Sequence, residues 1–274
     1  MRIFWLAGLV ASLAAPAAAQ QTPPEQWHTV LAPSPNIAIG KRTVTIPGEK
    51  GTSFQADVYA PAGTPRGAIV FISGTDNARA WGNYIDLAKL AAEHGLIGII
   101  PDKRWPRGGG SAAFETSHAD TIALLKALGT GGEIGIGADR TCAWLFSGGG
   151  VQLAAVFDPA AQQLACTIGF YPYFGGPDGT PAEAWARTYQ PLDAFRAHAA
   201  TRRMPMLLVR AGKDSEGLNR RLGDFVGAAL AANYDLRLIN LPDAVHAFDL
   251  LDDTDWSRAA LREAFDFAVT QTAR

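Results

Sequence analysis

The sequence Trp144-Leu145-Phe146-Ser147-Gly148-Gly149-Gly150 is an apolar run that leads into one serine and three glycines. The run predicts a buried strand over 141–146, and the apolar spacing beyond it predicts a helix over 149–157. A serine at such a strand-to-helix turn can be held on a tight bend when its neighbours have small side chains. The N–H groups at the start of the helix would then face a negative charge that develops on a reacting carbonyl. The alternative interpretation is that Ser147 is an ordinary helix N-cap.

Buried strands and amphipathic helices alternate on both sides of this turn. Strands are predicted over 67–73, 96–101, 165–171, 205–210 and 235–241, and helices over 83–94, 112–128, 218–233 and 256–270. Residues 41–46 and 54–59 alternate apolar and polar side chains, which is typical of antiparallel strands with one wet face. This order predicts one α/β domain over 39–274, with a mostly parallel sheet of about eight strands and helices on both faces. The longest interruption, 172–203, is too short for a large cap domain.

The composition excludes several classes of protein. With 48% hydrophobic residues and a net charge of −2, the chain is too apolar and too weakly charged to be disordered. Its 24 basic residues are balanced by 26 acidic ones, so we expect no nucleic-acid partner. Two cysteines cannot supply a four-ligand zinc site. No metal or cofactor is predicted. Four of the five histidines are scattered without metal-ligand spacing: His28, His94, His118 and His198.

The first 19 residues have the pattern of a secretory signal peptide. Met1 and Arg2 precede an apolar run over 3–15, and Pro16 is followed by small residues up to Ala19. The run is shorter than the roughly 20 residues that a membrane span needs. We therefore expect cleavage near Ala19, a periplasmic or secreted protein, and no membrane span in the mature chain. Residues 20–38 carry four Pro and one Asn and show little periodicity, which predicts a flexible lead-in.

Two more predicted strands are followed by side chains that suit catalysis by a serine. Asp214 comes just after the strand at 205–210, and His246 follows the strand at 235–241. A serine hydroxyl needs an imidazole to take its proton, and a carboxylate fixes the tautomer of that imidazole. Taken singly, Asp214 could cap the helix near Leu218, and His246 could be an ordinary loop residue. Because residue type, chain order and placement agree, we predict a triad of Ser147, Asp214 and His246.

Other residues near these strand ends are weaker candidates. Glu216 is an alternative acid, but Asp214 lies nearer its strand end. Asp249 is expected to cap a helix or form a local salt bridge. Two donors are needed for the developing oxyanion, and we predict the N–H of Gly148 and a donor at Thr75. Asp76 is the neighbouring alternative to Thr75.

Four aromatic residues fall in the predicted strand-end loops and could line an acyl or aryl pocket: Trp81, Trp105, Tyr173 and Phe174. Aromatic side chains at such positions more often serve only to fill the core.

Cys142 and Cys166 begin neighbouring strands of the predicted sheet. Export would permit a disulfide between them. Side chains on adjacent parallel strands rarely meet the required geometry, so two buried thiols are an equal alternative.

The chain resembles an α/β-hydrolase, closest in layout to the dienelactone hydrolase family and its prolyl-oligopeptidase-like relatives. The resemblance covers about 43–268 and rests on short pieces at strand ends: Ile72-Ser73-Gly74-Thr75, Pro101-Asp102-Lys103-Arg104, Gly108-Gly109-Gly110-Ser111, Asp139-Arg140, Ala211-Gly212-Lys213-Asp214 and His246-Ala247-Phe248. Two positions depart from the family pattern. Leu145 stands where a small residue usually precedes the nucleophile, and Ala247 stands where glycine often follows the histidine.

The resemblance implies Ser147 as nucleophile, His246 as general base and then acid, and Asp214 as its orienting carboxylate. It implies a serine hydrolase that acts on a small ester or lactone, and the signal pattern of residues 1–19 adds the expectation that this hydrolase is exported. A serine peptidase or acyltransferase with the same triad is an alternative, although the chain lacks a propeller or lid domain that would select peptides. An inactive hydrolase fold that only binds a ligand is a further alternative. The sequence leaves the oligomeric state open.

Overall fold

The protein is described by a computed structural model that covers residues 26–74, 78–102, 104, 111–129, 133–175 and 190–273, with the backbone alone for 111–114. The predicted signal peptide at 1–19 lies outside these residues, as do Thr75, Asp76 and Trp105.

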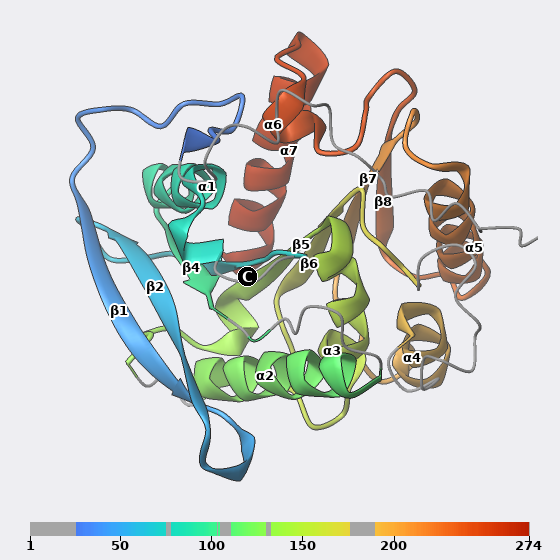
Figure 1. Ribbon diagram of the computed structural model, residues 1–274, viewed down its shortest axis with the longest axis horizontal. Coiled ribbons are helices and arrows are strands. Elements are labelled where there is room, and N and C mark those ends of the chain that lie inside the picture. The colour runs from blue at the N-terminus through green and yellow to red at the C-terminus, as the bar shows by residue number, and fades with distance from the viewer. Residues whose placement is uncertain are drawn as a thin grey trace, which may run out of the picture.

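One eight-stranded sheet runs through the molecule in the order β1-β2-β4-β3-β5-β6-β7-β8 (Figure 1). Its strands are β1 (Ile39–Pro47), β2 (Ser53–Pro61), β3 (Gly67–Ile72), β4 (Leu96–Pro101), β5 (Thr141–Phe146), β6 (Cys166–Phe170), β7 (Met206–Ala211) and β8 (Leu236–Leu241). β1 pairs with β2 and β2 with β4 in antiparallel fashion, and every other neighbouring pair is parallel. The predicted mostly parallel sheet of eight strands is confirmed.

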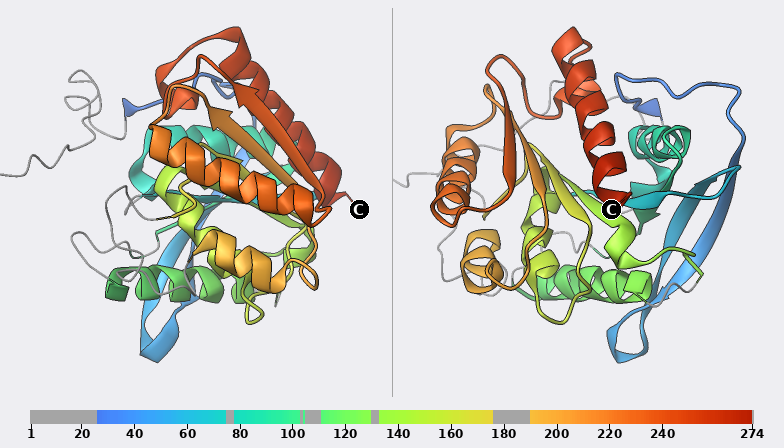
Figure 2. Two further views of the ribbon diagram at one scale, coloured as in Figure 1. Left: turned by 90° about the vertical axis from the view of Figure 1, so that its right-hand side faces the viewer. Right: turned by 180° about the vertical axis from the view of Figure 1, so that it is seen from behind.

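Helices cover both faces of the sheet, as predicted (Figures 1 and 2). They are α1 (Gly82–Glu93), α2 (Ser111–Gly129), α3 (Leu153–Phe157), α4 (Pro191–His198), α5 (Glu216–Ala231), α6 (Phe248–Leu251) and α7 (Asp255–Thr272). Apolar residues of α1, α6 and α7 form one buried cluster on the sheet, and those of α2, α3, α4 and α5 form the other. None of the helices in the described part of the chain is long and apolar enough to cross a membrane.

The central strands are apolar throughout because helices cover them on both sides. Every residue of β3, β4, β5 and β6 is buried. Along β5 the side chains alternate between the two buried clusters, with Trp144 and Phe146 on the α1 and α7 face and Leu145 on the other. The helix predicted over 149–157 differs in its first part, where a 3₁₀ turn, η5 (Ser147–Gln152), precedes α3.

The described part of the lead-in, 26–38, contacts the domain instead of extending freely from it. The Trp27 ring lies edge-on to that of Trp81, with 4.9 Å between centroids. The Thr29 hydroxyl and the Val30 N–H both donate to the carbonyl oxygen of Asp249, at 2.9 and 2.8 Å. Apolar side chains of this segment have surface to bury against the domain. The flexibility predicted for 20–38 stays a prediction.

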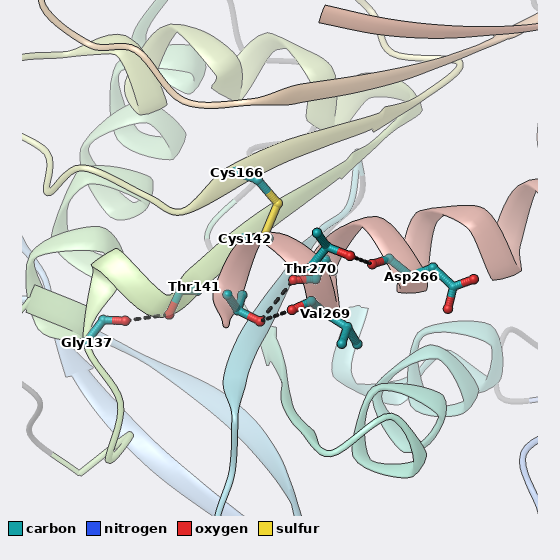
Figure 3. Close-up of a disulfide and its surroundings, with 9 residues drawn as sticks. Gly137, Thr141, Cys142, Cys166, Asp266, Val269 and Thr270 are labelled. Carbon is teal, nitrogen blue, oxygen red and sulfur yellow. Dashed lines mark hydrogen bonds between the residues drawn. A yellow bond between two sulfur atoms is a disulfide. The ribbon is translucent and has the colours of Figure 1, made fainter. Parts of the chain in front are cut away.

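Cys142 and Cys166 form a disulfide between β5 and β6 (Figure 3). The two residues are register partners, their Cα atoms are 4.5 Å apart, and both side chains are fully buried beneath α7. The sequence left open whether these cysteines were bonded, and the structure shows the bonded form. The disulfide joins the starting ends of two strands that lead toward the residues described next.

Replacing both cysteines with alanine should lower the melting temperature by roughly 6–12 °C. Loops of about this length contribute about 3 kcal/mol in the chain-entropy model, and each kcal/mol shifts the melting temperature of a domain this size by about 2–4 °C. Circular dichroism during heating measures the shift. A matched sample of unreduced wild-type protein should gain no mass on thiol alkylation. An unchanged melting temperature would show that the bond contributes no stability.

Candidate active site

Ser147 lies on a strained turn at the carboxyl end of β5. Its φ is 50°, in the left-handed region that is costly for a residue with a side chain. The N-cap of η5 is Phe146, so Ser147 is not the capping residue. Its Oγ lies 2.8 Å from Nε2 of His246. The structure therefore excludes the capping interpretation of this serine.

Glycines supply the space that the turn requires. A Cβ on Gly149 would lie 2.2 Å from the carbonyl oxygen of Ile72 in β3, and one on Gly74 would lie 2.7 Å from the backbone nitrogen of Gly148. Leu145 does not crowd the turn, because its side chain is buried in the core on the α2 face of the sheet. The departure from the family pattern at Leu145 is thus accommodated by the fold.

His246 joins the serine to Asp214. Its Nδ1 lies 2.6 Å from Oδ2 of Asp214, while Oδ1 of Asp214 accepts a hydrogen bond of 2.7 Å from the N–H of Ser215. The His246 side chain is 33% exposed and that of Asp214 is 9% exposed, so the carboxylate is shielded and the imidazole is accessible. The structure brings together the three residues predicted as a triad.

Two loops are held together to make the Asp214 and His246 pair. The N–H of Lys213 donates to the carbonyl of Ala244 at 2.9 Å. Ser215 caps α5, since its Oγ accepts the N–H of Leu218. Asp214 is therefore free of the capping role that the sequence allowed, and the alternative acid Glu216 is simply the first residue of α5.

Ala247, the second departure from the family pattern, has a φ of 58°. This is the left-handed conformation that glycine adopts without strain. The chain thus makes a left-handed turn after the histidine with an alanine, at a cost in backbone strain.

The structure describes only one of the two predicted oxyanion donors, Gly148. Gly148 directly follows the serine at the start of η5, and Gly74 in the loop after β3 approaches it closely. Thr75 and Asp76 lie outside the described residues, so their role stays a prediction. The described residues hold no group of three or more His, Cys, Asp or Glu side chains placed to bind a metal ion.

Tyr173 lies beside the triad. Its ring centroid is 5.7 Å from that of His246, and its N–H donates to the carbonyl of Ser147 at 2.9 Å. Burial raises the pKa of its hydroxyl. Of the three proposed pocket-wall residues that the structure describes, Tyr173 is the one that lies against the imidazole.

The other proposed pocket residues have different positions. Phe174 is buried in the core, with its ring centroid 4.5 Å from that of Phe225, so its side chain packs within the fold. Trp81 is partly buried and lies against Trp27 of the N-terminal segment. Trp105 lies outside the described residues. Substrate contact by Trp81 and Trp105 stays a prediction.

Sequence reasoning missed Tyr171, whose ring lies beside His246, and assigned Asp249 a different role. The Tyr171 ring centroid is 4.7 Å from that of the imidazole, and the Tyr171 hydroxyl donates to a carboxylate oxygen of Asp249. Asp249 was expected to cap a helix or form a local salt bridge. It is instead fully buried, and its side chain bonds a residue 78 positions away. The position of Tyr171, directly after a buried strand, is the signal that could have identified it.

Comparison with solved structures shows that this architecture is the α/β-hydrolase fold. No protein-family model matches the chain, and no curated protein matches it either. Solved esterase structures superpose on most of it. Esterase Est22 does so with a TM-score of 0.68 at 16% identity, over 86% of this chain and 82% of its own. The predicted α/β-hydrolase fold is confirmed.

Two further esterases have the same fold. One from Pyrobaculum calidifontis has a TM-score of 0.66 at 17% identity, over 87% of this chain and 88% of its own. The carboxylesterase EstE1 from a metagenomic library has a TM-score of 0.65 at 19% identity, over 89% and 92%. At these identities the likeness concerns the fold.

Replacing Gly149 with alanine should destabilise the protein by about 1–3 kcal/mol, because the added methyl group would meet the backbone of β3. Gly227 in α5 is the matched control, since a Cβ there has no atom within 4 Å. Gly227→Ala should raise stability by about 0.5–1 kcal/mol, as expected for a helix interior. Urea unfolding measures both changes. Equal effects of the two substitutions would contradict the steric argument.

Replacing Asp249 with asparagine should change the pH dependence of stability, because burial raises the pKa of this carboxyl from 3.8 to about 6. Between these values the carboxyl ionises in the unfolded chain but keeps its proton in the folded one. The wild type should therefore lose up to about 3 kcal/mol relative to the variant as the pH rises through this window. Urea unfolding at a series of pH values measures this difference. Asp266→Asn, at an exposed position of α7, is the control and should show no such trend.

Proposed function

We propose that this chain is a serine hydrolase that cleaves carboxylic esters or lactones through an acyl-enzyme on Ser147. The observation that carries the proposal is the chain of contacts from Ser147 Oγ to His246 Nε2, at 2.8 Å, and from His246 Nδ1 to Asp214 Oδ2, at 2.6 Å. Both distances suit hydrogen bonds, and the arrangement supplies a nucleophile, a base and an orienting carboxylate.

In this mechanism Nε2 of His246 takes the hydroxyl proton as Oγ attacks the carbonyl carbon of the ester. The negative charge on the substrate oxygen is stabilised by the N–H of Gly148 and by a donor at Thr75. The protonated imidazole then gives its proton to the leaving alcohol, and the acyl group remains on Ser147. Water, activated by the same imidazole, releases the acid and restores the serine. Asp214 accepts a hydrogen bond from Nδ1–H throughout and stabilises the charged imidazole without taking its proton.

The esterase neighbours support this class of reaction, and the structure of Est22 with p-nitrophenol suggests aryl esters as first test substrates. The dienelactone hydrolase-like assignment is part of the proposal and rests on the short pieces of sequence at the strand ends. Lactones therefore belong in the substrate panel beside open esters.

Export to the periplasm or the medium is also part of the proposal. It rests on the signal pattern of residues 1–19, and the Cys142–Cys166 disulfide supports it because such bonds persist in oxidising compartments.

Ser147→Ala should lower the hydrolysis of p-nitrophenyl acetate by at least about 10³-fold, because removal of a triad nucleophile leaves only binding and oxyanion stabilisation. A fluorophosphonate probe should label wild-type protein at Ser147, as located by mass spectrometry of peptides. Ser53→Ala, at the exposed start of β2, is the control and should keep wild-type turnover. Full turnover by the Ser147 variant would overturn the proposal.

A further inference from the structure

Tyr171, the residue after β6, has a φ of 38°, which is strained for an aromatic side chain. Its N–H donates to the carbonyl of Val209 on β7 at 2.8 Å, and its buried ring adjoins His246. Strained backbone persists only where the surroundings impose it, and it gathers at functional sites. The conformation of Tyr171 therefore calls for a functional explanation.

The turn that begins at Tyr171 also packs against the serine. The N–H of Tyr173 donates to the carbonyl of Ser147 at 2.9 Å. A Cβ on Gly150 would lie 2.6 Å from the Tyr173 nitrogen and 2.7 Å from Cβ of Pro172, so the turn and the elbow are in close contact. One short turn thus contacts both the nucleophile segment and, through the two tyrosine rings, the imidazole.

Asp249 fixes the other end of the Tyr171 side chain. The hydroxyl of Tyr171 donates to Oδ1 of this carboxyl, which has no exposed surface. Among the residues that the structure describes, none donates to Oδ2. Burial of a half-paired carboxyl is unfavourable, and an apolar side chain would fill the space without that cost. The bond to Tyr171 gives a reason for a carboxyl at this position.

Asp249 is itself held in place from a distant part of the chain. It lies in α6, three residues after His246, and its carbonyl accepts bonds from Thr29 and Val30. The side chains whose charges act on it are Tyr84 of α1, Tyr171 and His246. Tyr84 is in turn hydrogen-bonded to Ser73 at the end of β3.

We propose that Asp249 and Tyr171 are positioning residues that hold the imidazole of His246 at its working distance from Ser147. Asp249 anchors the Tyr171 hydroxyl, and the anchored Tyr171 keeps both the strained turn under Ser147 and the ring beside the imidazole in place. The inference rests on the proposed hydrolase function. Neither residue is assigned a contact with the substrate.

Tyr171→Phe keeps the ring and removes the hydroxyl, and it should lower kcat for p-nitrophenyl acetate by about tenfold with little change in KM, since small misplacements of reacting groups are costly. Asp249→Leu, which removes the acceptor, should have a similar effect. Asp249→Asn keeps an oxygen acceptor and should recover most of that loss. The Tyr171→Phe and Asp249→Leu double variant should be no slower than the slower single variant, because both changes break one bond.

Tyr234→Phe is the matched control. Its hydroxyl is also buried in hydrogen bonds, with Met204 and Arg202, but it packs beside Phe157 and Phe195 on the other face of the sheet. This variant should lose stability and keep the wild-type kcat. A purely structural role for the Tyr171 hydroxyl would give the same result in Tyr171→Phe.

The outcomes separate this inference from the proposed function. If wild-type protein hydrolyses the ester and is labelled at Ser147, but folded Tyr171→Phe keeps kcat within about threefold of wild type, the positioning role is wrong and the hydrolase stands. Additive losses in the double variant would also overturn it. If Tyr171→Phe does not fold, the comparison of Asp249→Asn with Asp249→Leu decides, and equal kcat in these two variants counts against the role. A wild-type protein that neither reacts nor labels refutes the proposed function itself.

Discussion

The parallel register of β5, β6, β7 and β8 is the constraint on which the candidate site depends. Phe146 pairs with Phe170, Phe170 with Val209, and Ala211 with Leu241, so these strands end along one edge of the sheet. Side chains that follow the strands are therefore carried to the same edge, although they are far apart in sequence. A single hydrogen-bonded chain from serine to imidazole to carboxylate is the result. A shift of one residue in any of these pairings would turn alternate side chains to the opposite face and separate them.

Contacts both near this edge of the sheet and far from it hold the strand ends in place. At the far end of the same strands, the disulfide joins β5 to β6, which lead to Ser147 and to Tyr171. At the near end, glycines allow the loop after β3 to touch the serine elbow. The N-terminal segment reaches α6 and bonds the backbone of Asp249. The site thus depends on segments from the lead-in to α6, and each of these segments is attached to the same central sheet.

Much of this arrangement could be predicted from the sequence, because burial and chain order leave clear patterns. The structure has β4 and β5 at the predicted bounds, because short apolar runs between turn residues are typical of buried strands. The proposed triad could be predicted because a serine, an aspartate and a histidine each follow a predicted strand. The disulfide could not be predicted, because it depends on which residues of two strands are register partners. The Tyr171 and Asp249 pair was missed because a buried polar contact between distant residues has no local signature. The contacts of Trp27 and Thr29 were missed because an irregular segment can still have individual side chains that fit the domain surface.

The distribution of backbone strain has a consequence for protein engineering. Five non-glycine residues in the described ranges have positive φ, and three of them, Ser147, Tyr171 and Ala247, surround the proposed catalytic groups. Substitutions that relax strained backbone are a common route to heat-resistant variants. In this molecule, most of the strained residues are ones on which turnover would depend. Thermostabilisation should therefore begin at Lys50 and Asn233, the two strained residues outside the site, where a gain in heat resistance need not reduce activity.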